Sequence, residues 1–166
     1  MLVCKTTLVS LFFFTNFENM AANRNSSGNI HFFFQGVKFS LTNRNSLKQF
    51  LLGLFKKEGK SVLTVNYIFV TDDALLQINR QYLSHDYYTD IITFDLSEDE
   101  SITADIFISI DRVRENAISA SSSLKKELHR VIFHGALHLC GYKDKTKPDQ
   151  TTMRAKEDHY IRLYLS

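Results

Sequence analysis

Apolar and polar positions along the chain fall into short β-like runs and longer runs of helical period. Apolar side chains that recur every three or four residues predict helices over 47–55, 75–82, 111–119 and 124–140. Runs rich in β-branched and aromatic residues predict strands over 30–34 (continuing into 38–41), 62–70, 89–94 and 104–109. The acidic segment that separates the last two strands is typical of a hairpin turn. This order predicts an α+β domain with a small sheet.

One predicted helix, from Leu124 to Gly141, carries apolar side chains on two opposite sides. Placing its residues at about 100° intervals therefore predicts burial from two directions, with Leu124 on one apolar stripe. Gly135 lies in the middle of that stripe, which indicates the close approach of another backbone. Ser123 is a natural N-cap, and Gly141 suits the left-handed residue that ends a helix.

Length and composition narrow the class of protein. The chain has 166 residues, 44% of them hydrophobic, which suffices for one domain whose core needs no disulfide or metal. Its longest apolar stretch, 8–14, is too short to span a bilayer, so no membrane association is expected. Two cysteines cannot form a disulfide framework, which favours a reducing, cytoplasmic compartment. The net charge of +2 permits a nucleic-acid partner without indicating one.

The first 29 residues differ from the rest. Lys5 and the apolar residues after it imitate a secretory signal, but Thr and Ser interrupt the apolar part, and Asn19 occupies the place of a small cleavage-site residue. A polar, linker-like stretch follows to Asn29. We expect 1–29 to be a disordered extension or a mis-assigned start, with Met20 as the true first residue. A signal peptide and an ordered strand are the alternatives, and the domain itself is expected over 30–166.

A candidate metal site lies at the end of the helix. His134 and His138 are four residues apart, so their side chains project from one face with Cβ atoms about 5–6 Å apart. The chain then reverses after Gly141 and delivers Asp144. Two imidazole nitrogens and one carboxylate oxygen, with a fourth position open, are typical of a catalytic zinc, and the carboxylate admits other divalent metals. The alternative is two half-buried histidines bonded to backbone groups, with Asp144 as a turn residue.

One component of zinc peptidases is missing from this helix. In His-Glu-x-x-His proteases, the residue after the first histidine is the general base. Here that residue is Gly135, which has no side chain. Ordinary zinc peptidase chemistry therefore lacks its base unless another acid replaces it.

The segment from His134 to Asp144 resembles the signature His-Gly-x-Leu-His-Leu-x-Gly-Tyr-Asp-His of the YbeY family of metal-dependent endoribonucleases. Upstream, 76–82, 89–94 and 104–109 resemble three further family blocks in the right order. Downstream, Met153 and Glu157 fall near the Met-x-x-x-Glu that closes the pattern. The resemblance runs from about residue 30 to residue 161.

This resemblance implies a zincin-like α+β single domain, with a small mixed sheet of about four strands packed against several helices. It implies one zinc ion per chain, bound by a central helix and the loop after it, and cleavage of single-stranded RNA. The implied role is 3′-end maturation of 16S ribosomal RNA and ribosome quality control. The implied partners are ribosomal RNA, the small ribosomal subunit and its assembly factors.

Three residues of this chain occupy the family's ligand positions. His134 and His138 match two ligands directly, and Asp144 stands where most members have a third histidine. A second departure is Leu83, at the position where the family usually has an arginine that is thought to serve catalysis. No catalytic arginine can therefore be carried over there.

Proton transfer and RNA contacts have weaker candidates. The metal held by the triad would activate a water or polarise a phosphoryl oxygen, and the titratable residues considered for proton transfer are Asp90, His85 and Glu157. Each of them can instead be structural. The basic residues considered for RNA binding are Lys143, Lys145, Lys147 and Arg80. The lysines can instead complement the dipole of the preceding helix.

Two other classes of function stay open from the sequence. The first is a zinc hydrolase of peptides or amides, against which the missing base at position 135 counts. The second is a ribosome-associated RNA-binding protein whose metal is structural.

Overall fold

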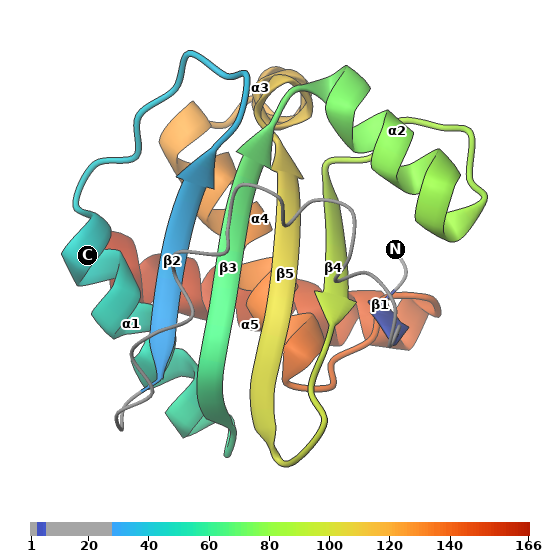
Figure 1. Ribbon diagram of the computed structural model, residues 1–166. Coiled ribbons are helices and arrows are strands. Elements are labelled where there is room, and N and C mark those ends of the chain that lie inside the picture. The colour runs from blue at the N-terminus through green and yellow to red at the C-terminus, as the bar shows by residue number, and fades with distance from the viewer. Residues whose placement is uncertain (1–2, 6–27) are drawn as a thin grey trace.

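The computed structural model describes residues 3–5 and 28–166 of the chain (Figure 1). Its strands are β1 (Val3–Lys5), β2 (Asn29–Phe34), β3 (Ser61–Val70), β4 (Ile91–Asp95) and β5 (Ser101–Ser109). Its helices are α1 (Arg44–Lys57), α2 (Asp72–Leu83), α3 (Ile110–Ser119), α4 (Leu124–Leu139) and α5 (Lys147–Leu165). No helix in this described part is long and apolar enough to cross a membrane.

The strands form one mixed sheet in the order β1-β4-β5-β3-β2. Strands β4 and β5 pair antiparallel, as the predicted hairpin requires, and the other three pairings are parallel. The α+β class and the mixed sheet are thus confirmed. The sheet has one strand more than the expected four, because the backbone of 3–5 pairs with 93–95 of β4. The remainder of the predicted extension, 1–2 and 6–27, lies outside the described residues.

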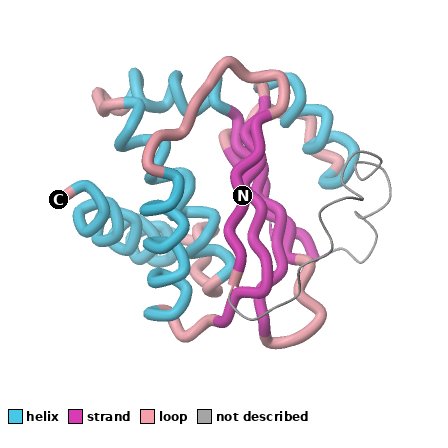
Figure 2. The backbone as a smooth tube through the Cα atoms, turned by 60° about the vertical axis from the view of Figure 1, so that its left-hand side comes forward, coloured by secondary structure: helices cyan, strands magenta, loops and turns pink. Residues whose placement is uncertain are grey.

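Helices cover both faces of the sheet, and α2 lies on the opposite face from α4 and α5 (Figure 2). The larger core joins β2, β3 and β5 to α1, α3, α4 and α5 through side chains that include Leu51, Ile106 and Phe133. A smaller core lies under α2, where Leu75 and Ile78 pack with Phe94 and other side chains of the sheet. Two separately filled faces explain why the central strands are apolar along most of their length.

Helix α4 begins and ends where the sequence predicts. The Ser123 hydroxyl accepts a hydrogen bond from the backbone N–H of Lys126 at 3.2 Å. Gly141 has a φ of 99°, the left-handed region that favours glycine after a helix. Leu124 is an exception to the predicted burial, because it is 37% exposed in the first turn.

Gly135 is needed for close packing, but side chains and not a backbone approach it. A Cβ atom added there would lie 2.9 Å from Cδ1 of Ile91 and 3.1 Å from Cγ2 of Ile106. The opposite side of α4 packs against helices, where the Phe133 ring lies 5.3 Å from that of Phe50 and 5.9 Å from that of Tyr164. Burial from two directions is therefore confirmed, and α4 is the central helix of the domain.

Two further elements differ from the sequence interpretation. Residues 38–41 form a loop and not a strand, although Leu41 is buried in the core. The sequence pattern does not predict helix α5, because few of its 19 residues face the core. The buried ones are Met153, Glu157, Tyr160 and Ile161. Its start carries a clear local signal, since the Thr146 side chain and the Asp149 carboxylate cap each other's backbone N–H groups.

Candidate metal centre

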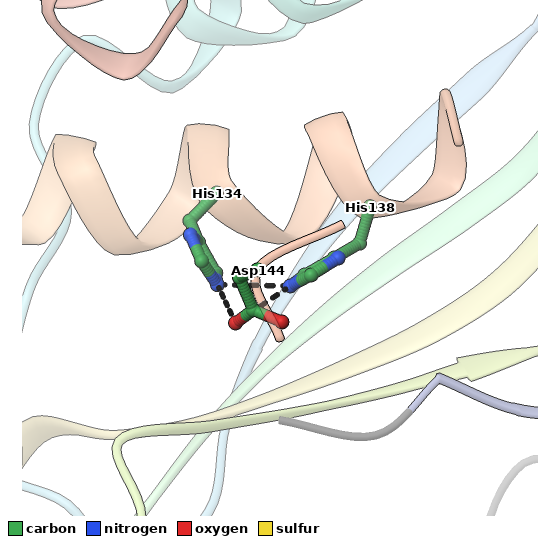
Figure 3. A group of neighbouring side chains, drawn as sticks. All are labelled: His134, His138 and Asp144. Atoms are coloured by element: carbon green, nitrogen blue, oxygen red, sulfur yellow. Dashed lines mark hydrogen bonds and ion pairs between the residues drawn. The ribbon is translucent and has the colours of Figure 1, made fainter. Parts of the chain in front are cut away.

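His134, His138 and Asp144 converge on one point beside α4 (Figure 3). One ligand atom from each residue lies within 4.8 Å of the other two. The two imidazole Nε2 atoms are 2.9 Å apart, and Asp144 Oδ2 lies 3.6 Å from Nε2 of His134 and 3.5 Å from Nε2 of His138. The i, i+4 spacing on α4 and the reversal after Gly141 therefore bring together the three residues that the sequence singled out.

The other nitrogen of each ring has a fixed acceptor. Nδ1 of His134 lies 2.7 Å from Oε1 of Glu157, and Nδ1 of His138 lies 2.8 Å from the carbonyl oxygen of Tyr142. A carbonyl and a carboxylate accept, so each Nδ1 carries a hydrogen, and Nε2 of a neutral ring then presents a lone pair. The pKa of His138 is lowered by burial and by the nearby His134, which favours the neutral ring.

Three potential metal-ligand atoms face one another at these distances. Two neutral Nε2 atoms and a carboxylate oxygen would repel one another unless a proton or a cation lies among them. The donor set of two nitrogens and one oxygen, each ring oriented by a further hydrogen bond, suits a divalent metal ion. The residues present therefore fit the metal that the sequence analysis predicted.

The loop that supplies Asp144 is anchored through Tyr142. Its hydroxyl donates to Oε2 of Glu58 at 2.8 Å, at the C-terminal end of α1. Glu58 also accepts hydrogen bonds from the Tyr160 hydroxyl and, at 2.9 Å, from Nζ of Lys156. The pKa of Glu58 is lowered, because these donors outweigh the effect of burial. Sequence reasoning missed Glu58, because nothing in the local pattern at the end of α1 connects it with a residue 84 positions away.

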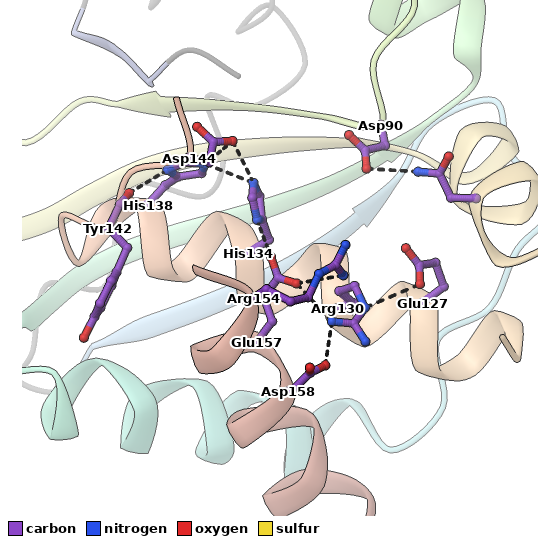
Figure 4. A network of polar contacts seen from close by, with 11 residues as sticks. Asp90, Glu127, Arg130, His134, His138, Tyr142, Asp144, Arg154, Glu157 and Asp158 are labelled. Atoms are coloured by element: carbon purple, nitrogen blue, oxygen red, sulfur yellow. Dashed lines mark hydrogen bonds and ion pairs between the residues drawn. The ribbon is translucent and has the colours of Figure 1, made fainter. Parts of the chain in front are cut away.

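Glu157 lies in a buried ionic network behind His134 (Figure 4). Its Oε2 atom accepts from Arg130 at 3.0 Å and from Arg154 at 3.2 Å, while Oε1 faces His134. Burial alone would raise the pKa of Glu157, but the hydrogen bonds from His134 and Arg130 outweigh it and the pKa is lowered. Arg130 also pairs with Asp158 at 2.8 Å. The network holds Glu157 ionised and engaged with the imidazole.

Asp90 is the second proton-transfer candidate that the fold brings near the triad. It lies just before β4 and lines a cavity of about 400 Å³ together with His134 and Glu157. Its Oδ2 atom accepts a hydrogen bond from Nδ2 of Asn116 on α3 at 3.2 Å. Burial raises the pKa of Asp90, with opposing influence from His134.

The candidates on and after α2, Arg80 and His85, contact residues of their own segment. His85 follows α2 and contacts the Tyr87 hydroxyl at 3.0 Å, and Arg80 on α2 pairs with Asp86 at 2.5 Å. Helix α2 lies on the opposite face of the sheet from α4 (Figure 2). The basic residues beside Asp144 are all exposed: Lys143, Lys145 and Lys147.

Comparisons with known proteins cover most of this chain. The family model described as Endoribonuclease YbeY matches residues 34–164. An Endoribonuclease YbeY from Cytophaga hutchinsonii is 53% identical over 135 residues, covering 81% of this chain and 94% of that protein. One from Porphyromonas gingivalis is 43% identical over 132 residues, covering 80% and 87%. A solution structure of a Thermotoga maritima protein superposes with a TM-score of 0.58 at 30% identity, covering 81% of this chain and 88% of that one.

Proposed function

Because this chain belongs to the YbeY family of endoribonucleases, we propose that it is a zinc-dependent enzyme that cuts single-stranded RNA at the His134–His138–Asp144 site. Endoribonucleases act on phosphodiester bonds within RNA, so RNA is the substrate class. The observation that carries the zinc assignment is the convergence of three acceptor atoms with both Nδ1 atoms already committed elsewhere. Zinc is proposed because two of the three donors are imidazole nitrogens.

In this assignment His134, His138 and Asp144 are the ligands of one zinc ion per chain. Zinc bound there would act as a Lewis acid toward water and phosphoryl oxygens. Glu157 and the Tyr142 carbonyl are positioning groups, because each holds an Nδ1–H and so directs Nε2 toward the metal. The carboxylate of Glu157 is engaged by His134 and Arg130 and so contributes orientation, whereas Asp90 lines the adjoining cavity.

Exposed lysines supply the proposed contacts with the RNA backbone. Lys143, Lys145 and Lys147 flank Asp144, so phosphates that approach the metal pass among positive charges. Following the family, we propose that the substrate is ribosomal RNA and that the enzyme matures the 3′ end of 16S ribosomal RNA and serves ribosome quality control. The proposed partners are the small ribosomal subunit and its assembly factors, in the cytoplasm.

The decisive experiment combines metal content with cleavage. The full chain, loaded with one equivalent of zinc, is incubated with an end-labelled single-stranded RNA, with the same RNA as a duplex, and with a labelled peptide. We expect cleavage of the single strand, loss of cleavage with a chelator, and recovery when zinc is added back. His138→Ala should lose both zinc and cleavage, whereas His159→Ala, which changes a histidine on the surface of α5, should retain both.

Each competing function has its own outcome in this experiment. RNA binding that survives chelation, without any cleavage, would overturn the nuclease and favour a binding protein with a structural metal. Cleavage of the peptide but not of RNA would favour the amide hydrolase.

A further inference from the structure

We propose that the cavity beside His134 holds the ribose of one nucleotide of the RNA, and that Asp90 with Asn116 recognises its 2′-hydroxyl group. This inference rests on the proposed function and adds a means of distinguishing RNA from DNA. The cavity is a space beside the three proposed ligands. Its walls come from the segment before β4, from α3, from α4 and from α5, and His134 is the proposed ligand that lines it.

The size and position of the cavity suit one nucleoside. Its volume of about 400 Å³ lies within the range of small-molecule sites. Its polar wall includes Asp90, Asn116, Ser119, Glu127, Arg130 and His134. Because His134 belongs to both the cavity and the triad, a strand whose phosphate lies at the triad would place an adjoining sugar in the cavity.

Among the carboxylates that line the cavity, Asp90 differs from Glu127 and Glu157 because its side-chain partner is an amide and not an arginine. Glu127 and Glu157 both pair with Arg130, at 3.6 and 3.0 Å. Within the described residues, Asp90 forms no salt bridge, and Asn116 is the one side chain that donates to it. The carboxyl group of Asp90 therefore retains accepting capacity on the side of the cavity.

Hydroxyl groups match this acceptor better than phosphates do. A phosphate placed against Asp90 would meet like charge, whereas a ribose hydroxyl would donate to the carboxylate. An acidic side chain bonded to a ribose hydroxyl is how dinucleotide-binding folds hold the sugar of their cofactor. The 2′-hydroxyl is also the group by which a protein can tell RNA from DNA at one position.

The position of Arg154 suits a nucleotide whose ribose faces Asp90 and whose phosphate faces solvent. Arg154, whose side chain is 61% exposed, lies at the solvent side of the same cavity and pairs with Glu157 at 3.2 Å. A phosphate next to the bound ribose can contact this guanidinium without entering the acidic interior. The ribose would then lie inside the cavity and the phosphate at its solvent side. An extended RNA strand presents sugars and phosphates in this alternating order.

The test measures binding under conditions in which no strand is cut. Metal-free full-length protein is titrated with a fluorescent single-stranded RNA and with the DNA of the same sequence. We expect the wild type to bind the RNA roughly tenfold more tightly, the discrimination that one hydrogen bond to a charged group supplies. Asp90→Ala and Asn116→Ala should bring the two affinities close together, mainly by weakening RNA binding. Asp99→Ala, an exposed acid in the β4–β5 hairpin, is the matched control and should keep the wild-type ratio.

Two results would overturn the inference. The first is equal affinity of the wild type for RNA and DNA. The second is an unchanged ratio in Asp90→Ala, and a large loss of cleavage rate in the zinc-loaded form of that variant would then assign the residue to proton transfer. Thermal unfolding of each variant establishes that it is folded. Cleavage of RNA by the zinc-loaded wild type, run in parallel, separates a failure of this inference from a failure of the proposed function.

Discussion

The Nδ1 atom of His134 lies 2.7 Å from Oε1 of Glu157, which comes from a different helix and is itself bonded to two arginines. This contact orients the imidazole and directs its Nε2 atom toward the other two proposed ligands. The orientation of one proposed ligand thus depends on a buried carboxylate 23 residues further along the chain.

Replacing Glu157 tests this dependence. Glu157→Gln keeps the size of the side chain but removes the charge that supports the imidazole, so zinc affinity should fall by roughly 10–100-fold. Competition with a chromophoric chelator measures the affinity. Asp158→Asn is the matched control, because Asp158 pairs with Arg130 but has no contact with His134. Equal affinities in the two variants would show that the His134 contact does not tune the site.

Asp144 should accept one replacement and not another. Asp144→Ala removes the oxygen ligand and should lose bound zinc, whereas Asp144→His supplies a third imidazole and should retain it. Native mass spectrometry of the two purified variants gives the metal content directly. Full zinc occupancy in Asp144→Ala would remove Asp144 from the ligand set and leave only the two histidines.

Glu58 should matter for stability. Glu58→Ala leaves the hydroxyls of Tyr142 and Tyr160 without their acceptor, and the free energy of unfolding should fall by about 1–3 kcal/mol. Urea denaturation of the metal-free protein measures the change. Glu98→Ala, at an exposed position in the hairpin, should stay within about 0.5 kcal/mol of the wild type. A similar effect of both substitutions would argue against Glu58 as an anchor.

His129 should make the metal-free protein less stable in mild acid. Burial lowers its pKa in the folded state, and its Nδ1–H donates to the Lys125 carbonyl oxygen at 2.6 Å. Below about pH 6.5, the unfolded state therefore binds more protons than the folded state, so stability falls as the pH falls. Urea titrations at several pH values should show a shallower dependence in His129→Gln than in the wild type. An unchanged slope would mean that other groups carry the acid sensitivity.

Local patterns predicted most elements of the fold because each one carries its own signal. Ser123 and Gly141 delimit α4, and the β4–β5 hairpin follows from two apolar runs around an acidic turn. The triad was also predictable, since His134 and His138 are fixed by helical spacing. The apolar pattern of 38–41 predicts a strand, but the structure has a loop there, in which Phe39 and Leu41 pack on the core.

Contacts between distant segments could not be predicted in the same way. Glu58 and Tyr142 meet because α1 and the loop after α4 pack side by side, a relationship that no periodicity contains. The family pattern brought Glu157 to attention as a titratable residue, but only the packing of α5 shows that it supports His134. Gly135 was singled out correctly as a site of close packing, while the identity of its neighbours, Ile91 and Ile106, depends on the register of the sheet.

The position of Glu157 on α5 has a consequence for the timing of activity during synthesis. Both histidines leave the ribosome before α5 does, so a partly made chain contains the ligands without the carboxylate that orients one of them. Such a chain would hold its metal loosely and with a misdirected ring. The orientation of His134 is therefore complete only once α5 has docked against α4.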